Sequence, residues 1–197
     1  RQRQMCIRAR SNYLVEVYMN TRSYEAALKS IERIAKPSAQ IMEAKQKILF
    51  QLGTQSFANT NFEQALQYLN QSIAIGQYNR QTKADAYYWC GESYYRLNRM
   101  MEAARDFNAY LQLTTQPNNE MYALANYNLG YIAFHRKDYT QASNYFQKYI
   151  QLEKGENRTA LADAYNRIGD CHLNVRNFEE AKHYYCLLYT SDAADDK

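Results

Sequence analysis

The sequence has 197 residues, of which 46% are hydrophobic, and it contains only six Gly and two Pro. This composition favours helices and supplies enough apolar side chains for a continuous core. The apolar stretches are a few residues long, far below the roughly 20 residues that cross a bilayer, so no membrane span is expected. The formal charge of +4 is modest and gives no indication of a nucleic-acid-binding protein.

The N-terminal residues carry a concentration of basic side chains, with Arg1, Arg3, Arg8 and Arg10 close together. Such a cluster can contact an acidic partner or nucleic acid, but on an amphipathic helix it is more often a solvated face. We favour the solvated face and expect no nucleic-acid partner. The chain begins at Arg1 without an initiator Met, so a signal peptide or lipid anchor can precede it, and the compartment stays open.

A large apolar residue followed three positions later by Ala recurs along the chain, and a second large apolar residue follows each Ala by four. Successive Ala residues are 38, 38, 39 and 39 positions apart. Residues at these spacings share one helix face. The five sets are Tyr24, Ala27 and Ile31; Phe62, Ala65 and Leu69; Met100, Ala103 and Phe107; Tyr139, Ala142 and Phe146; and Phe178, Ala181 and Tyr185. They predict helices near 23–35, 61–75, 99–113, 138–152 and from 177 onward.

A Gly preceded by a small or aliphatic residue recurs upstream of these helices. Small Gly and Ala residues let two antiparallel helices approach closely, while the large residues fill the space beside the contact. The pattern therefore predicts five helical hairpins. The pairs are Leu52–Gly53, Cys90–Gly91, Leu129–Gly130 and Ile168–Gly169, and Val15 takes the Gly position in the first hairpin.

Polar and turn-forming residues mark the expected helix boundaries. Capping boxes are predicted for Asn61 with Gln64, Asp138 with Gln141, and Asn177 with Glu180. A left-handed stop after a second helix is predicted at Gly76 and Gly155, and inter-hairpin turns at Pro37 and Pro117.

These features resemble the tetratricopeptide repeat, which has an aromatic residue, a Leu–Gly pair and a Tyr in its first helix and an Ala and a Phe in its second. The third hairpin fits best, through Tyr87, Cys90, Gly91, Tyr94, Ala103 and Phe107. The resemblance implies an all-α fold, a right-handed α-solenoid of about five helix–turn–helix hairpins with a 38–39-residue period. The array covers residues 1–185, with repeats at about 6–37, 40–76, 80–115, 119–154 and 158–185, the last one truncated.

The C-terminal residues 186–197 differ from the repeats. The string from Cys186 to Asp195 resembles the conceptual translation of a transposon-type sequencing adapter. We therefore interpret 186–197 as a non-native tail, exclude it from fold reasoning and expect the natural protein to continue past Tyr185.

In the tetratricopeptide family the first helices line a concave surface, which binds protein or peptide partners. The matching positions here are Phe50, Thr54 and Phe57; Tyr88, Glu92 and Tyr95; Tyr127, Tyr131 and Phe134; and Asn166, Asp170 and Leu173. Many are aromatic, a residue class that dominates interface hot spots. The alternative is that several of these rings pack against the neighbouring repeat. The family's carboxylate clamp for chaperone C-termini is not supported, because its Lys, Asn and Arg positions are largely aromatic or acidic here.

The sequence shows no Gly-rich phosphate loop, zinc motif or nucleophile elbow, so we expect no enzyme activity and no cofactor. His135, His172 and His183 are placed on separate helices without a partner at ligand spacing, and no metal site is expected. Cys6, Cys90 and Cys171 lack the paired spacings of a zinc or redox motif, and we interpret them as buried small side chains.

The predicted function is a non-catalytic scaffold that binds a protein or peptide and belongs to a larger bacterial protein. The alternative is a regulatory or sensory repeat region whose kinase or transcription-regulator domain lies outside this sequence. The string from Ala84 to Tyr95 resembles repeats of bacterial cell-envelope proteins related to the Tol-Pal coordinator, and residues 126–131 and 166–171 resemble large repeat proteins of Bacteroidota. This resemblance implies a periplasmic or envelope location, with the cytoplasm as the alternative; the oligomeric state stays open.

Overall fold

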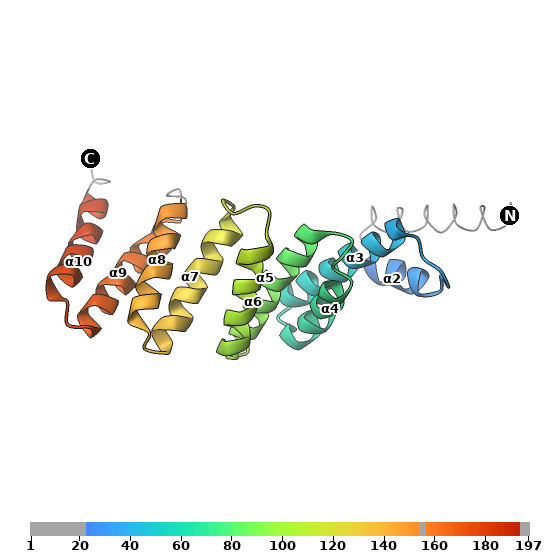
Figure 1. Ribbon diagram of the computed structural model, residues 1–197, viewed down its shortest axis with the longest axis horizontal. Coiled ribbons are helices and arrows are strands. Elements are labelled where there is room, and N and C mark those ends of the chain that lie inside the picture. The colour runs from blue at the N-terminus through green and yellow to red at the C-terminus, as the bar shows by residue number, and fades with distance from the viewer. Residues whose placement is uncertain (1–22, 154–156, 194–197) are drawn as a thin grey trace. The chain divides into compact units, whose positions relative to one another are not determined.

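The computed structural model describes the backbone of residues 23–153 and 157–193 and the side chains as far as residue 187, and every regular element within these ranges is an α-helix (Figure 1). The helices are α2 (Tyr24–Glu32), α3 (Ala39–Ala58), α4 (Phe62–Ala74), α5 (Arg80–Arg96), α6 (Met100–Leu113), α7 (Glu120–His135), α8 (Tyr139–Leu152), α9 (Arg158–Asn174) and α10 (Phe178–Ala193). None of them is long and apolar enough to cross a membrane.

First and second helices of the hairpins alternate along the described chain. Helices α3, α5, α7 and α9 carry the Gly positions, and α2, α4, α6, α8 and α10 lie within a few residues of the five predicted second helices. The predicted all-α fold of tandem hairpins is therefore confirmed. The first helix of the first hairpin, with Val15, Cys6 and the basic cluster, lies outside the described residues.

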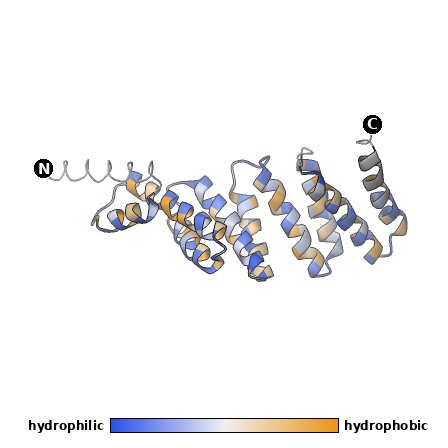
Figure 2. Ribbon diagram, turned by 180° about the vertical axis from the view of Figure 1, so that it is seen from behind, coloured by the Kyte–Doolittle hydropathy of each residue, from blue (hydrophilic) through white to orange (hydrophobic). Residues whose placement is uncertain are grey.

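The chain divides into two compact units at residues 115 and 116. The N-terminal unit contains α2 to α6, and the C-terminal unit contains α7 to α10. Hydrophobic and hydrophilic residues alternate along the helices of both units (Figure 2), so each helix can bury one face and leave another in water.

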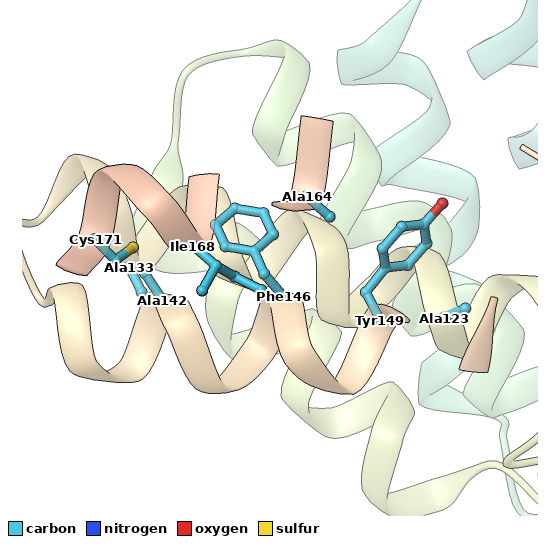
Figure 3. Close-up of a cluster of buried hydrophobic side chains, with 8 residues drawn as sticks. All are labelled: Ala123, Ala133, Ala142, Phe146, Tyr149, Ala164, Ile168 and Cys171. Atoms are coloured by element: carbon cyan, nitrogen blue, oxygen red, sulfur yellow. The ribbon is translucent and has the colours of Figure 1, made fainter. Parts of the chain in front are cut away.

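The contact between the two helices of a hairpin confirms the predicted register. A Cβ atom added at Gly130 would lie 2.8 Å from Phe146 Cε1, and one at Gly91 would lie 2.8 Å from Phe107 Cδ1. The Ala positions of the second helices are 0–2% exposed. In the C-terminal unit, Figure 3 shows Phe146 and Tyr149 of α8 surrounded by small and aliphatic residues of α7, α8 and α9. Only small residues at these positions allow such close packing.

Each of the four hairpin turns that the structure describes contains one non-Gly residue in the left-handed conformation. They are Thr60, Asn98, Lys137 and Arg176, with φ of 62°, 59°, 63° and 62°. Each lies two residues beyond a first helix, where its N–H and the next N–H bond back to that helix; Thr60 N bonds to Phe57 O at 2.8 Å and Asn61 N to Ser56 O at 2.9 Å. This is the Schellman arrangement.

These turns correct two predictions about helix ends. The capping boxes do not form, because the N–H that Gln64, Gln141 or Glu180 would have to bind is already donated to a carbonyl of the first helix. Only the other half of the box is seen at Asp138, whose side chain accepts from Gln141 N at 3.1 Å. The second correction concerns Gly76, which does not have the predicted left-handed conformation. It is buried, and a Cβ atom added there would lie 2.4 Å from Lys83 Cδ. Gly155 lies outside the described residues.

The first helices that the structure describes, α3, α5, α7 and α9, begin with side-chain caps that were not predicted from the sequence. The cap residues and the backbone N–H groups that they accept are Ser38 with Ile41, Asn79 with Thr82, Asn119 with Tyr122, and Asn157 with Ala160, at 2.8–3.3 Å. These bonds fix where each first helix starts and therefore which side chains reach its outer face.

Candidate partner-binding face

The candidate site is the set of first-helix positions predicted to meet a partner, which we call the first-helix face of each unit. In the N-terminal unit it comprises Phe50, Thr54 and Phe57 of α3 and Tyr88, Glu92 and Tyr95 of α5. In the C-terminal unit it comprises Tyr127, Tyr131 and Phe134 of α7 and Asn166, Asp170 and Leu173 of α9. Every one of them lies on a described helix.

In the N-terminal unit, Tyr88 belongs to the interior of its hairpin. It is 4% exposed, and its ring centroid lies 5.8 Å from that of Phe107 and 5.4 Å from that of Tyr110. Its hydroxyl donates to Glu92 Oε1 at 3.2 Å. A ring packed in this way supports the hairpin and has little surface left for a partner.

The ring of Phe57 contacts both the second helix of its own hairpin and the first helix of the next hairpin. Phe57 of α3 packs edge-on against Trp89 of α5 at 4.9 Å and against Phe62 at 5.3 Å. Phe50, Thr54 and Tyr95 are half-buried. Burial raises the pKa of Tyr95, and the nearby charge of Glu92 raises it further while Arg96 lowers it. Its hydroxyl therefore stays protonated at neutral pH.

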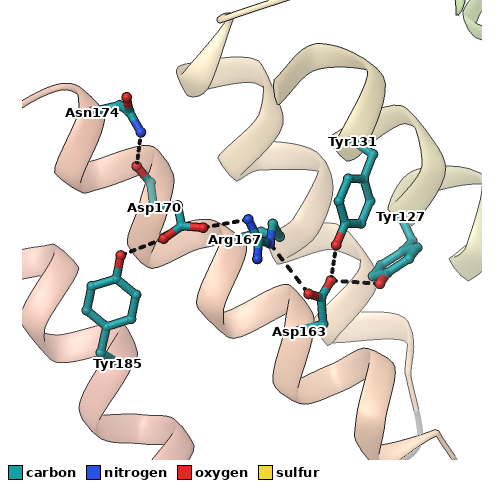
Figure 4. A network of polar contacts seen from close by, with 7 residues as sticks. All are labelled: Tyr127, Tyr131, Asp163, Arg167, Asp170, Asn174 and Tyr185. Carbon is teal, nitrogen blue, oxygen red and sulfur yellow. Dashed lines mark hydrogen bonds and ion pairs between the residues drawn. The ribbon is translucent and has the colours of Figure 1, made fainter. Parts of the chain in front are cut away.

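In the C-terminal unit, the tyrosines of α7 are joined to α9 by an aspartate that the sequence reading did not single out. Tyr127 donates its hydroxyl to Asp163 Oδ2 at 2.7 Å, and Tyr131 donates to the same oxygen (Figure 4). Both rings also pack on Phe146, with centroid distances of 5.8 and 5.3 Å. The two tyrosines are thus held at both ends, by the core and by the carboxylate.

Arg167 extends this network along α9. Its Nη1 lies 2.7 Å from Asp170 Oδ2, and its guanidinium carbon lies 5.9 Å from the centre of the Phe134 ring. Its Nε lies 3.4 Å from Asp163 Oδ1, but this buried nitrogen makes no hydrogen bond in the described structure. Asp170 also accepts the hydroxyl of Tyr185 at 2.7 Å. Figure 4 shows the guanidinium between the two carboxylates.

The protonation of this network is set mainly by burial. Burial raises the pKa of Tyr131 to about 12, and its hydrogen bond to Asp163 acts in the same direction. The pKa of Tyr127 is raised for the same two reasons. Both hydroxyls therefore remain donors over the physiological pH range, and Asp163 receives two O–H bonds at one oxygen.

The remaining predicted residues of this face differ in exposure. Phe134 is half-buried and packs against Tyr139 at 5.4 Å. Asn166 is half-buried, and Leu173 is 46% exposed. The structure therefore brings Tyr127, Tyr131 and Asp170 into one polar network, with Phe134 beside Arg167.

Three residues of the two faces were missed from sequence: Trp89, Asp163 and Arg167. Asp163 stands six positions before Gly169, the same register as Asp85 before Gly91. An acidic residue one helical turn before a face position is the signal that could have found it. Trp89 and Arg167 each follow a predicted face position directly, so they lie at the edge of the predicted strip.

The described residues hold no group of three or more His, Cys, Asp or Glu side chains suited to a metal ion. The ring of His172 stacks on Tyr184 at 5.5 Å, and His135 lies beside Tyr131. Cys90 and Cys171 are buried, as predicted, whereas Cys6 lies outside the described residues. Burial raises the pKa of both thiols, that of Cys171 to about 12, which disfavours the nucleophilic thiolate.

Comparison with known proteins supports the repeat assignment. A family model described as a tetratricopeptide repeat matches residues 123–155 and 162–195, and a second model of the same description matches residues 50–120. No curated protein matches the sequence.

Several solved structures share the fold at low sequence identity. A MamA protein is 17% identical with a TM-score of 0.63, over 94% of this chain and 92% of that chain. BtubC (BKLC) from P. vanneervenii is 13% identical with a TM-score of 0.67, over 94% and 80%. MamA 41-end from Desulfovibrio magneticus RS-1 is 15% identical with a TM-score of 0.62, over 96% and 97%. At such identities the likeness shows the fold alone, the α-solenoid class.

Proposed function

Because the chain belongs to the tetratricopeptide-repeat family, whose members are typically non-catalytic interaction scaffolds, we propose that it is a scaffold that binds a protein or peptide segment on its first-helix face. We place the binding surface in the C-terminal unit, on Tyr127, Tyr131 and Phe134 of α7 and Asn166 and Asp170 of α9. In the N-terminal unit, Phe50, Phe57, Glu92 and Tyr95 form a second candidate surface.

The observation that carries this proposal is the fixed position of half-buried aromatic rings in the C-terminal unit. Tyr127 and Tyr131 are held by Phe146 on one side and by Asp163 on the other. Binding of a partner to such rings costs little side-chain entropy of the scaffold, because the rings are already ordered. Large, rigid, amphipathic rings are the residue class that contributes most to interfaces.

The test uses the full chain as bait for a random peptide library, followed by titration calorimetry with an enriched peptide. The face variant is Phe134→Ala with Asn166→Ala, which leaves the tyrosine–Asp163 bonds intact. We expect it to lower the affinity about tenfold, or by about 1.4 kcal/mol, which is more than most interface residues contribute and less than a hot spot does. The control is Gln141→Ala with Lys148→Ala, two exposed residues of the second helix α8.

Both double variants should keep helical circular dichroism. The face variant should melt at a lower temperature than the parent, because Phe134 packs on Tyr139 and on the core of its unit, so affinities are compared well below both melting temperatures. Equal affinity of the face variant and the parent, or an equal loss in the control, would remove the first-helix face as the binding surface. Failure of the library to yield any peptide that binds the folded chain would count against the scaffold function itself.

We further propose that this scaffold is part of a larger bacterial cell-envelope protein. The support is the resemblance of residues 84–95 to envelope repeat proteins. Cell fractions of the native organism, probed with an antibody raised against residues 23–153, test both the length of the protein and its location. The proposal expects a band longer than this chain in the envelope fraction; a cytoplasmic band of the same length as this chain would contradict it.

A further inference from the structure

We infer that the partner segment bound by the C-terminal unit presents a Lys or Arg side chain, which binds between the carboxylates of Asp163 and Asp170 and beside the ring of Phe134. This inference rests on the proposed function and names the chemistry of its ligand.

The polar network of this face has a formal charge opposite in sign to that of the whole chain. The whole sequence has a formal charge of +4, yet among the described residues Asp163 and Asp170 form ion pairs with one cation, Arg167. The other predicted face residues of this unit, Tyr127, Tyr131, Phe134, Asn166 and Leu173, carry no charge. The network therefore has a formal charge of −1, and a cationic side chain complements it.

The bonding of Asp163 leaves one of its oxygens with a poor partner. Oδ2 accepts two tyrosine hydroxyls. Among the described residues, Oδ1 has only the 3.4 Å ion pair to Arg167 Nε, and this buried nitrogen makes no hydrogen bond. The side chains of Asp163 and Asp170 are 30% and 29% exposed. Both carboxylates can therefore be reached from solvent, and Oδ1 can accept a stronger charge-assisted bond than the one it has.

The position of Arg167 shows that the face accommodates a cation. Its guanidinium lies between two carboxylates and 5.9 Å from the Phe134 ring, the arrangement in which carboxylate pairing and the negative face of an aromatic ring act together. We infer that the partner's cation competes with Arg167 for these groups. Because Arg167 is 32% exposed, it has room to turn toward solvent when the partner binds.

The experiment compares three fluorescein-labelled ten-residue peptides by fluorescence anisotropy against the full chain. All three alternate Leu with a second residue, which is Lys, Gln or Glu. We expect the Lys peptide to bind about tenfold more tightly than the Gln peptide and the Glu peptide to bind most weakly. The preference for Lys over Gln should shrink when the salt concentration is raised from 50 to 300 mM, because these carboxylates are partly exposed.

Three variants place the effect on this face. Asp163→Asn with Asp170→Asn should abolish the preference for Lys over Gln. Glu179→Gln with Glu180→Gln removes the same charge from exposed positions on α10 and should keep that preference. Arg167→Gln should strengthen binding of the Lys peptide severalfold, because the internal competitor is gone. Structural damage cannot mimic this last result, since a loosened face would bind more weakly.

The outcomes separate this inference from the function on which it rests. Preferential binding of the Glu peptide would show that Arg167 binds the partner and that the partner is acidic. This result would overturn the inference. Equal loss of the Lys preference in the Glu179 and Glu180 variant, weaker binding by Arg167→Gln, or no binding of the Lys peptide would also overturn it. If all three peptides bind alike and Phe134→Ala weakens all three, the scaffold function stands and the charge preference falls.

Discussion

The first-helix faces of the two units share a register but are built differently. In the N-terminal unit, Tyr88 is buried in its own hairpin and Phe57 packs on Trp89 of the next first helix. In the C-terminal unit, Tyr127 and Tyr131 stay half-buried and bond to Asp163 of the next first helix. One face is joined across its hairpins by apolar ring contacts, the other by a polar network.

The difference follows from what each preceding helix offers to an aspartate in the same register. Asp163 meets two phenol hydroxyls from α7, whereas at the corresponding positions of α3 stand Phe50 and Thr54. Thr54 donates its hydroxyl to Gln51 O of its own helix at 3.0 Å. Asp85 is therefore left with Gln81 Nε2 at 2.7 Å. The aspartate of a first helix therefore bonds to the preceding first helix only where that helix supplies two tyrosine hydroxyls.

The largest effect is expected from breaking the core that supports each face. Gly130→Leu drives a side chain into Phe146, on which Tyr127 and Tyr131 pack. Ala142→Leu overfills the same hairpin. Overpacking of this kind costs about 1–3 kcal/mol, and the 2.8 Å approach at Gly130 places that variant at the upper end. Urea denaturation followed by circular dichroism measures the loss.

In the N-terminal unit, Gly91→Leu should have a comparable effect through Phe107 and Tyr88. An exposed-site control such as Gln71→Leu should leave the denaturation midpoint nearly unchanged. Unchanged melting of both Gly130→Leu and Ala142→Leu would refute the hairpin register itself.

The second effect in size comes from removing the polar join. Asp163→Ala leaves two phenol hydroxyls and part of Arg167 without their acceptor, and we expect about 1–2 kcal/mol of destabilisation, since the site is partly exposed and water replaces some of the bonding. Asp85→Ala removes a carboxylate with one side-chain hydrogen bond and should cost less. Parallel urea titrations test the order, and an equal or larger loss in Asp85→Ala would show that the two aspartates have the same role.

The sequence predicted the helices well and the turns poorly. The repeat of Ala65, Ala103 and Ala142 predicted the second helices to within a few residues, because the closest helix contacts tolerate only small side chains. The turns were harder. Thr60, Asn98, Lys137 and Arg176 share a left-handed backbone but no side-chain chemistry, and the pattern is invisible unless the register is already known.

The site was predicted only in part. A helical register predicts the direction in which a side chain points, but it does not predict how deeply that side chain is buried. It placed Tyr88 and Tyr127 at equivalent positions, yet the first is 4% exposed and the second is half-buried. Their different depths depend on packing with residues on other helices. Asp163 escaped notice because its role depends on two tyrosines more than thirty residues earlier, a relation that a single sequence does not reveal.

A smaller effect, dependent on pH, is expected at Asp85. Burial raises the pKa of Asp85, and the hydrogen bond from Gln81 only partly offsets this. The folded state therefore holds the proton of Asp85 more tightly than the unfolded state does. The contribution of this group to stability is present at low pH and is lost as pH rises through its folded pKa. Asp85→Asn removes that loss.

The measurement is the difference in unfolding free energy between the parent and Asp85→Asn, taken from pH 4 to pH 7. We expect the parent to become less stable relative to the variant as pH rises. The control is Asp138→Asn, an exposed cap in the C-terminal unit. A difference that stays constant, or one that moves in favour of the parent, would show that burial does not govern Asp85.

The smallest expected effect lies in the hairpin turns and compares residues within one unit. Thr60 and Asn98 occupy the same left-handed position of the N-terminal unit, but a β-branched residue is strained there whereas Asn tolerates it. Thr60→Gly should raise the unfolding free energy by roughly 0.5–1 kcal/mol, since relief of strain exceeds the entropy cost of Gly. Asn98→Gly should gain less. Thermal melts of both variants give the order, and a loss of stability in Thr60→Gly would mean that contacts of the Thr side chain, such as its bond to Asn59 O at 2.7 Å, outweigh the backbone strain.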